Sequence, residues 1–286
     1  MADTNLNRRR QTLRTLGALV FARSAFALDL DEYFERIGHR SGSVPGVENL
    51  YSLAECHPQA IPFENLDSFV GATAELDIGS LVRKLVRSER GGDGFEHNLL
   101  LRHVLRAMGY RVECLSANVL RAEPHSCSWA RGHLILNVEA EGTQFIVDAG
   151  FGAPTPTAPL RLVMGVEQST PHEIYRLLPR GDDFLLQVKR SVGWRALYRF
   201  GLGEPRLPVG DPDVDGTATD LIVTRRAPRG HYVLHNTELS VHDTSGGFDR
   251  RVLSTTAELR GVLADCFRLQ APASPSVERA FASLFR

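Results

Sequence analysis

The chain has few of the residues that mark several common protein classes. Its 286 residues include only 4 Cys, and Cys56, Cys114, Cys127 and Cys266 lie far apart without a CxxC pair. That spacing excludes a disulfide-rich scaffold and matches no zinc motif. We therefore expect that the protein binds no metal. We also expect its cysteines to be reduced thiols, as in a cytoplasmic protein. No apolar run reaches the roughly 18 residues of a membrane span, so we expect no membrane association.

An excess of charge of either sign is also lacking. The sequence has 33 Lys and Arg against 34 Asp and Glu, a formal net charge of −1. Proteins that bind nucleic acids usually carry a basic excess, so we expect no nucleic-acid partner. With 43% apolar residues, the composition is that of a globular protein that can bury a sizeable core.

Residues 1–27 form a basic leader whose role stays open. They contain five Arg and one acidic residue, and the apolar stretch Leu16–Phe21 precedes Ala25-Phe26-Ala27, which has the form of a signal cleavage site. Arg9-Arg10 resembles a twin-arginine export signal, whereas Arg23 interrupts the apolar region. Export is therefore a minor alternative to the cytoplasm, beside a basic amphipathic leader or a mis-assigned start codon.

Helical periodicity dominates the first 110 residues. Helices are predicted at 28–37, 47–54, 78–88 and 96–108. In the last of these, Leu100, Leu101, Val104 and Leu105 share one face, and Gly109 is a suitable C-terminal stop.

Alternation with a period of two, typical of strands, follows Tyr110. It predicts strands at 110–120, 133–140, 143–147, 173–178, 184–190, 196–200, 221–224, 232–236 and 238–243. Two helices are expected near the end, one with Thr256 as N-cap and one over 275–284 with Ser274 as N-cap. Helices and strands do not alternate regularly, so the pattern predicts an α+β fold.

A glycine-rich turn lies directly before the clearest helix, in Arg90-Gly91-Gly92-Asp93-Gly94-Phe95-Glu96. Bare backbone N–H groups at a positive helix end suit an anion or a thiolate. A simple tight turn into the helix explains the same residues, so the motif alone does not decide between the two interpretations.

A predicted hairpin brings a histidine and an aspartate together. A two-residue turn at Glu141-Gly142 would set Ile135 opposite Asp148, with His133 one diagonal step away on the same face. A His and an Asp so placed can form the base and the orienting acid of a catalytic triad. An ordinary polar face of a hairpin is the alternative.

Several motifs, in order along the chain, resemble the arylamine N-acetyltransferase family. They begin with Tyr33-Phe34-x-Arg36-Ile37-Gly38, Ile61-Pro62-Phe63-Glu64-Asn65-Leu66-Asp67, and Arg90-Gly91-Gly92 followed by Phe95-Glu96-x-Asn98. His133-Leu134 and Asp148-Ala149-Gly150-Phe151-Gly152 come next, and Trp194-x-x-Leu197-Tyr198-x-Phe200 lies further on. The resemblance covers nearly the whole chain after Leu28.

The resemblance implies an α+β, cysteine-protease-like acetyltransferase architecture: a helical bundle at 28–109, a β-barrel at 110–209 and an α/β lid at 210–286. It also implies a Cys–His–Asp triad in which Cys carries an acetyl group from acetyl-CoA, or from another acyl thioester, to a small-molecule amine. Relatives in antibiotic pathways release polyketide chains as amides, so an acyl-carrier protein is a further possible partner. His133 and Asp148 match the triad, and Phe63, Phe95 and Phe151 fall at pocket positions of the family.

The sequence departs from the family at the nucleophile, where Gly94 stands in the Cys position. Glycine has no side chain to acylate, and a thiolate is what attacks a thioester and leaves again readily. In a different triad enzyme, loss of the nucleophile costs on the order of 10⁶ in turnover. We therefore expect acetyl transfer through an acyl-enzyme to be absent or very weak. A second departure follows Val209, where the family's Ser-Thr-His-Pro-like piece near its cofactor cleft is missing.

Other groups could stand in for the missing thiol. Cys127 lies six residues before His133 and is a possible replacement nucleophile, although an incidental loop or packed cysteine is the favoured interpretation. His133 with Asp148 could also act alone as a general base that activates water or an amine, with room for that reactant at Gly94. Three interpretations stay open: altered acyl chemistry, a non-catalytic protein that binds a small aromatic or acyl ligand or a partner protein, and a recently inactivated or misread copy of an ordinary acetyltransferase.

Overall fold

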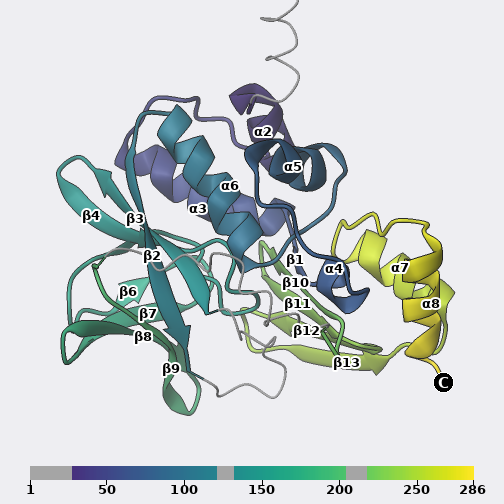
Figure 1. The fold of residues 1–286 in the computed structure, drawn as a ribbon. Coiled ribbons are helices and arrows are strands. Elements are labelled where there is room, and N and C mark those ends of the chain that lie inside the picture. The colour runs from purple at the N-terminus through teal and green to yellow at the C-terminus, as the bar shows by residue number, and fades with distance from the viewer. Residues whose placement is uncertain (1–27, 121–131, 204–217) are drawn as a thin grey trace, which may run out of the picture.

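The computed structural model describes residues 28–120, 132–203 and 218–286. Figure 1 shows helices at the top, a curved sheet at the lower left, and a second sheet with two helices on the right. No helix in these ranges is long and apolar enough to cross a membrane.

The helical part is built from short helices joined by tight turns. They are α2 (Leu30–Ile37), α3 (Val47–Ala60), α4 (Leu66–Phe69), α5 (Ile78–Leu81) with a π-helical continuation over Val82–Arg87, and α6 (Gly94–Ala107). Helix α2 ends at Gly38 as predicted, because Gly38 adopts φ 73°, a left-handed conformation that costs glycine little. Helices α2, α3 and α6 share one core that includes Tyr33, Leu53 and Leu101.

Several predicted helix boundaries differ from those in the structure. Helix α3 continues six residues past the predicted end at Ala54 and includes Pro58. Proline has no N–H to donate to the Ala54 carbonyl, so the last turn of α3 has one backbone hydrogen bond fewer. Helix α6 begins at Gly94 rather than Glu96, since the Asp93 side chain caps it and accepts hydrogen bonds from the N–H groups of Phe95 and Glu96.

The larger sheet has eight antiparallel strands. They are β2 (Arg111–Val119), β3 (His133–Ala140), β4 (Thr143–Val147), β5 (Leu160–Arg161), β6 (Gln168–Ser169), β7 (Ile174–Arg180), β8 (Asp183–Arg190) and β9 (Gly193–Phe200), in the order β5-β4-β3-β2-β9-β8-β7-β6. The two edges approach each other, because the Arg161 N–H donates to the Gln168 side chain across 2.7 Å. The sheet is therefore a nearly closed barrel, and the predicted α+β class is confirmed.

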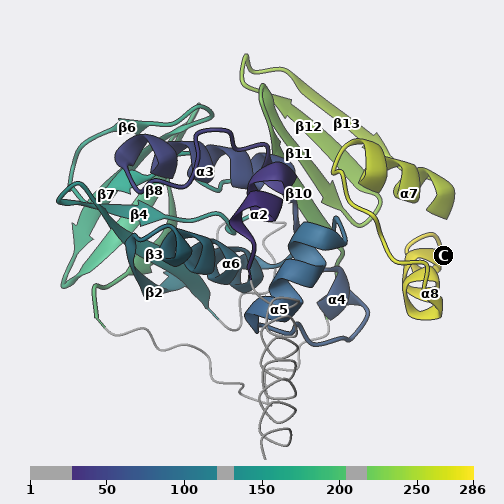
Figure 2. The same ribbon diagram turned by 90° about the horizontal axis from the view of Figure 1, so that it is seen from above.

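The smaller sheet combines one short strand from the helical part with four strands from the last third of the chain. It has the order β1-β10-β11-β12-β13, with β1 (Phe63–Glu64), β10 (Ile222–Ala227), β11 (Gly230–His235), β12 (Glu238–Asp243) and β13 (Phe248–Val252). Helices α7 (Thr256–Asp265) and α8 (Pro275–Ser283) pack on one of its faces (Figure 2). Ser274 caps α8 as predicted, whereas Thr255, not Thr256, caps α7 by accepting from the Glu258 N–H.

Strand β1 comes from the helical segment yet pairs with β10, Phe63 opposite Thr224. Strand β1 therefore lies in the segment 28–109 and the other four strands lie in 210–286, so the smaller sheet is built from both segments. Four strands were not predicted: β1, β5, β6 and β13. The first three have only two residues each, and every residue of β13 is exposed, so none of them shows an alternation of apolar and polar residues.

Candidate functional site

A buried charge cluster fixes the turn before α6. The Arg90 guanidinium donates to Glu64 at 2.8 Å and to Asp67 at 2.9 Å. Lys84 Nζ lies 2.6 Å from Asp67 and 2.7 Å from the Glu96 carboxylate. Because Glu64 belongs to β1 and Glu96 to α6, these pairs hold the glycine-rich turn between the helices and the smaller sheet.

The β3–β4 hairpin brings His133 and Asp148 into contact. Leu136 pairs with Val147, so the same register sets Ile135 opposite Asp148, as the two-residue turn predicted. His133 Nε2 lies 2.8 Å from Asp148 Oδ2, and both side chains are 0% exposed. Burial would raise the pKa of Asp148, but His133 and the hydrogen bonds that the carboxylate accepts hold that pKa below its usual value.

Asn98 orients the aspartate. Its Nδ2 donates to Asp148 Oδ1 at 2.9 Å and to the Leu134 carbonyl at 2.7 Å, and its Oδ1 accepts from the Ala149 N–H at 2.9 Å. Helix α6 thus carries both Gly94 and the side chain that fixes Asp148. The motif Phe95-Glu96-x-Asn98 therefore has a structural role in this chain.

Gly94 lies against the ring of His133. A Cβ atom built on Gly94 would be 2.8 Å from the Gly150 carbonyl oxygen and 2.9 Å from His133 Nδ1, where ordinary contact begins at 3.4 Å. A Cβ on Gly150 would be 2.7 Å from Gly94 Cα. The expectation that glycine leaves room for a reactant was wrong for this conformation, because the Gly150 backbone and the imidazole occupy the space.

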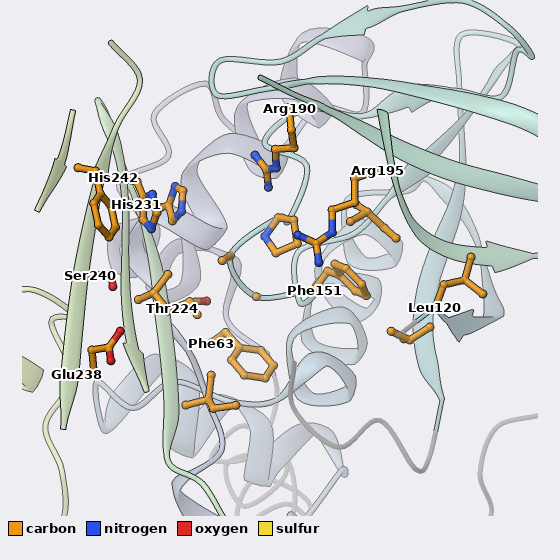
Figure 3. A pocket seen from close by; sticks show the side chains of 18 of the residues that line it. Phe63, Leu120, Phe151, Arg190, Arg195, Thr224, His231, Glu238, Ser240 and His242 are labelled. Atoms are coloured by element: carbon orange, nitrogen blue, oxygen red, sulfur yellow. The ribbon is translucent and has the colours of Figure 1, made fainter. Parts of the chain in front are cut away.

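A cavity of about 480 Å³ lies next to Phe151, and His133 and Gly94 are not among the residues that line it. Phe63 and Phe151 line it, and Figure 3 shows both rings at the end away from Arg190 and His242. The Phe151 ring centroid lies 5.0 Å from that of His133. The cavity therefore reaches the ring that packs on the histidine.

The remaining predicted site residues lie elsewhere. Phe95 packs into the core of the helical part. Cys127 lies outside the described residues. So do residues 210–217, which make up most of the stretch that lacks the family's Ser-Thr-His-Pro-like piece. Within the described ranges, no three His, Cys, Asp or Glu side chains are grouped as metal ligands would be.

Comparison with known proteins places this site in a family. A family model described as N-acetyltransferase matches residues 46–208. The arylamine N-acetyltransferase of Mycobacterium tuberculosis is 43% identical over 178 residues, which span 61% of this chain and 63% of that relative. The arylamine N-acetyltransferase of Mycolicibacterium smegmatis is 38% identical over 222 residues, 76% of this chain and 78% of that relative.

The chain belongs to the arylamine N-acetyltransferase family. Solved structures agree. The M. smegmatis arylamine N-acetyltransferase matches with a TM-score of 0.79 at 33% identity, over 91% of this chain and 99% of that one. The Mycobacterium marinum arylamine N-acetyltransferase in complex with CoA matches with a TM-score of 0.78 at 33% identity, over 90% of this chain and 98% of that one.

This arylamine N-acetyltransferase family member also has a buried chain of hydrogen bonds behind α6. Tyr33 Oη lies 2.7 Å from His57 Nδ1, His57 Nε2 lies 2.8 Å from His97 Nδ1, and His97 Nε2 lies 3.0 Å from the Pro62 carbonyl. Since that carbonyl can only accept, His97 donates to it, His57 donates to His97, and Tyr33 donates to His57.

Burial keeps both histidines neutral. It lowers the pKa of His57 well below its usual value and that of His97 to about 4. The sequence did not indicate this relay, because nothing in the spacing of Tyr33, His57 and His97 predicts contact. Tyr33 is the first residue of the first family motif, and His97 lies between the motif residues Glu96 and Asn98, but neither position indicates a contact with His57.

Proposed function

We propose that this family member has lost acetyl transfer through an acyl-enzyme, because Gly94 occupies the nucleophile position, and that it binds a small aromatic or acyl-thioester ligand in the cavity next to Phe151. One observation carries the proposal. Gly94 starts α6 against His133, and the Gly150 carbonyl oxygen lies 2.8 Å from where a Cβ would be. Neither a side chain nor a reactant fits there without movement.

Loss of the thiol removes the covalent step. In that step a thiolate attacks the thioester carbonyl, the donor thiol leaves, and the acyl group waits on sulfur for the amine. Glycine can supply neither the attacking electron pair nor the bond to the acyl group. The described cysteines do not replace it: burial raises the pKa of the Cys114 thiol, which packs in the core of the helical part.

A second candidate is one-step acyl transfer, favoured by the 2.8 Å contact between His133 and Asp148. Here a bound amine or water attacks the thioester carbonyl directly, His133 removes the proton of the attacking group, and the thiolate leaves and takes up a proton. The products are an amide or an acid, plus free thiol. This route requires the rings of Phe151 and Tyr198, whose centroids lie 5.0 and 5.5 Å from that of His133, to move aside.

The ligand class follows from the family. Acetyl-CoA or another acyl thioester and a small amine are the expected ligands, and an acyl-carrier protein as donor remains part of the proposal. The solved M. marinum relative was described in complex with CoA, which supports a thioester ligand here. A cytoplasmic location is likewise proposed, with export through residues 1–27 as the alternative.

Intact-protein mass after incubation with acetyl-CoA tests the loss of the covalent step. We expect no acetyl adduct on the wild type and an adduct on Gly94→Cys, in which a thiol stands at the start of α6 beside His133. An adduct on the wild type would refute the proposal and show a replacement nucleophile, with Cys127 the first residue to map.

Turnover separates the two candidates. The binding function predicts saturable binding of acetyl-CoA with no thiol release above background, both in the wild type and in His133→Ala. One-step transfer predicts thiol release by the wild type that His133→Ala abolishes while ligand binding persists. Full family activity in Gly94→Cys alone would instead indicate a recently inactivated copy.

A further inference from the structure

The end of the cavity farthest from Phe63 has two arginines that share one carboxylate. The Arg190 guanidinium lies 3.1 Å from Glu173, and that of Arg226 lies 2.8 Å from the other oxygen of the same carboxylate. Arg190 also lines the cavity, and Figure 3 shows its side chain projecting inward toward His231 and His242 on the smaller sheet.

The cluster keeps a net positive charge. Burial would raise the pKa of Glu173, but Arg226 and Arg190 lower it to about 2, so this carboxylate is ionised. Two guanidinium groups against one carboxylate leave one positive charge. The side chains of Arg226 and Glu173 are 2% and 9% exposed. Arg190, which shares the excess charge and lines the cavity, is 30% exposed, so a carboxylate in the cavity can reach it and form a charge-assisted hydrogen bond.

Among the described residues that line the cavity, His231 and Glu238 do not cancel this charge. Burial, together with Arg226 and His242, lowers the pKa of His231 to about 3, so the imidazole is neutral near pH 7. Glu238 also lines the cavity, but it forms an ion pair with Arg250. Among the described residues, Arg226 Nε has no hydrogen-bond partner although it is buried.

The other end of the cavity is mostly apolar. Phe63, Phe151, Leu197, Ile222 and Val233 line it, and Phe151 packs on His133, whereas the Arg195 side chain lies beside Phe151 (Figure 3). A volume of about 480 Å³ is that of a site for one small organic molecule. A ligand that fills both ends has an aromatic body against the phenylalanines and an anionic group at Arg190.

We propose that this cavity selects a small aromatic carboxylate, with the ring against Phe63 and Phe151 and the carboxylate on Arg190, where it neutralises the Arg190–Glu173–Arg226 cluster. The inference rests on the proposed ligand-binding function and names the ligand class of the same cavity. A planar carboxylate matches the fork of N–H groups of a guanidinium, and such charge-assisted bonds are strong when partly buried.

Calorimetric titration of the full-length protein with 2-naphthoate and 2-naphthamide tests this selection, since the two probes share a ring and differ in charge. We expect naphthoate to bind about tenfold more tightly. Arg190→Gln removes that preference and leaves naphthamide unchanged, whereas Arg190→Lys keeps part of it. Lys189→Gln is the matched control, because Lys189 lies on the same strand but pairs with Glu167 outside the cavity lining.

Each other result overturns the inference in a distinguishable way. Equal affinity for both probes refutes carboxylate selection and leaves ligand binding by the cavity intact. If Arg190→Gln weakens coenzyme A but not naphthoate, the anion recognised there is a phosphate. If naphthoate, naphthamide and acetyl-CoA all fail to bind to the folded wild type, the proposed function fails as well.

Discussion

Replacing Gly94 with alanine tests how tightly the site has closed around the glycine. The added Cβ would lie 2.8 Å from the Gly150 carbonyl oxygen, 2.9 Å from His133 Nδ1 and 3.0 Å from His133 Cε1. The imidazole cannot simply turn away, because its Nε2 lies 2.8 Å from Asp148. We therefore expect Gly94→Ala to destabilise the protein.

Two opposing effects set the change in the free energy of unfolding of Gly94→Ala. Alanine in place of glycine favours a helix by about 0.5–1 kcal/mol. Overpacking in a closed interior costs about 1–3 kcal/mol, and here the contacts must lengthen by roughly half an ångström to reach ordinary separation. The net expectation is a loss of about 1–2 kcal/mol, which lowers the melting temperature by about 2–8 °C for a chain of this size.

Gly261 provides the matched control. It lies inside α7, is exposed, and a Cβ built on it meets nothing within 4 Å. Gly261→Ala should therefore stabilise the protein by about 0.5–1 kcal/mol. Urea denaturation of the wild type and both variants, followed by circular dichroism, measures the difference.

A Gly94→Ala protein as stable as Gly261→Ala would refute the reasoning. It would mean that the Gly150 loop and the histidine leave space at residue 94 in solution. A reactant could then enter there, and one-step acyl transfer would gain support over ligand binding alone.

Three further predictions concern stability. Neutral, buried His57 and His97 should make the protein acid-labile, because folding lowers the pKa of both. Their contribution to the free energy of unfolding is fully present above about pH 6.5 and is lost as the pH falls toward about 4. For His97 alone, the loss is on the order of 3 kcal/mol. A free energy of unfolding that stays flat over that window contradicts this. Asn98→Ala should cost about 3 kcal/mol in urea denaturation, since it leaves the buried Ala149 N–H unpaired. Asn98→Asp can still accept that bond, but it should cost at least as much, because it sets a second carboxylate against buried Asp148 and the Leu134 carbonyl, to which Asn98 donates. Leu105→Ala, at a fully buried position of α6, should cost about 2–5 kcal/mol, and a loss under 1 kcal/mol would show that the core relaxes.

Long, periodic elements could be predicted from the sequence. Local patterns predict the apolar face of α6, the strands β3 and β4, and the two-residue turn at Glu141-Gly142. That turn sets the register of the hairpin, which brings His133 beside Asp148. Short elements could not. Strand β1 has two residues, and it exists because β10, far along the chain, pairs with it.

Some features of the candidate site can also be predicted from the sequence, and others cannot. The absence of a thiol at residue 94 is a property of the sequence alone, as is the presence of a histidine and an aspartate in one hairpin. How closely Gly94 and Gly150 approach is a tertiary property, since their elements meet only when α6 packs against the barrel. The same holds for the Tyr33–His57–His97 relay and for the shared carboxylate at Arg190 and Arg226, whose partners lie far apart along the chain.

The family, the α+β class and the chemistry that residue 94 cannot perform follow from the sequence, because they depend on which side chains exist and on local periodicity. Packing in three dimensions fills the space at Gly94, covers His133, and makes the cavity mostly apolar at one end and cationic at the other. Those properties depend on distances of a few tenths of an ångström and on charges brought together from distant strands, and no local pattern in a chain encodes either.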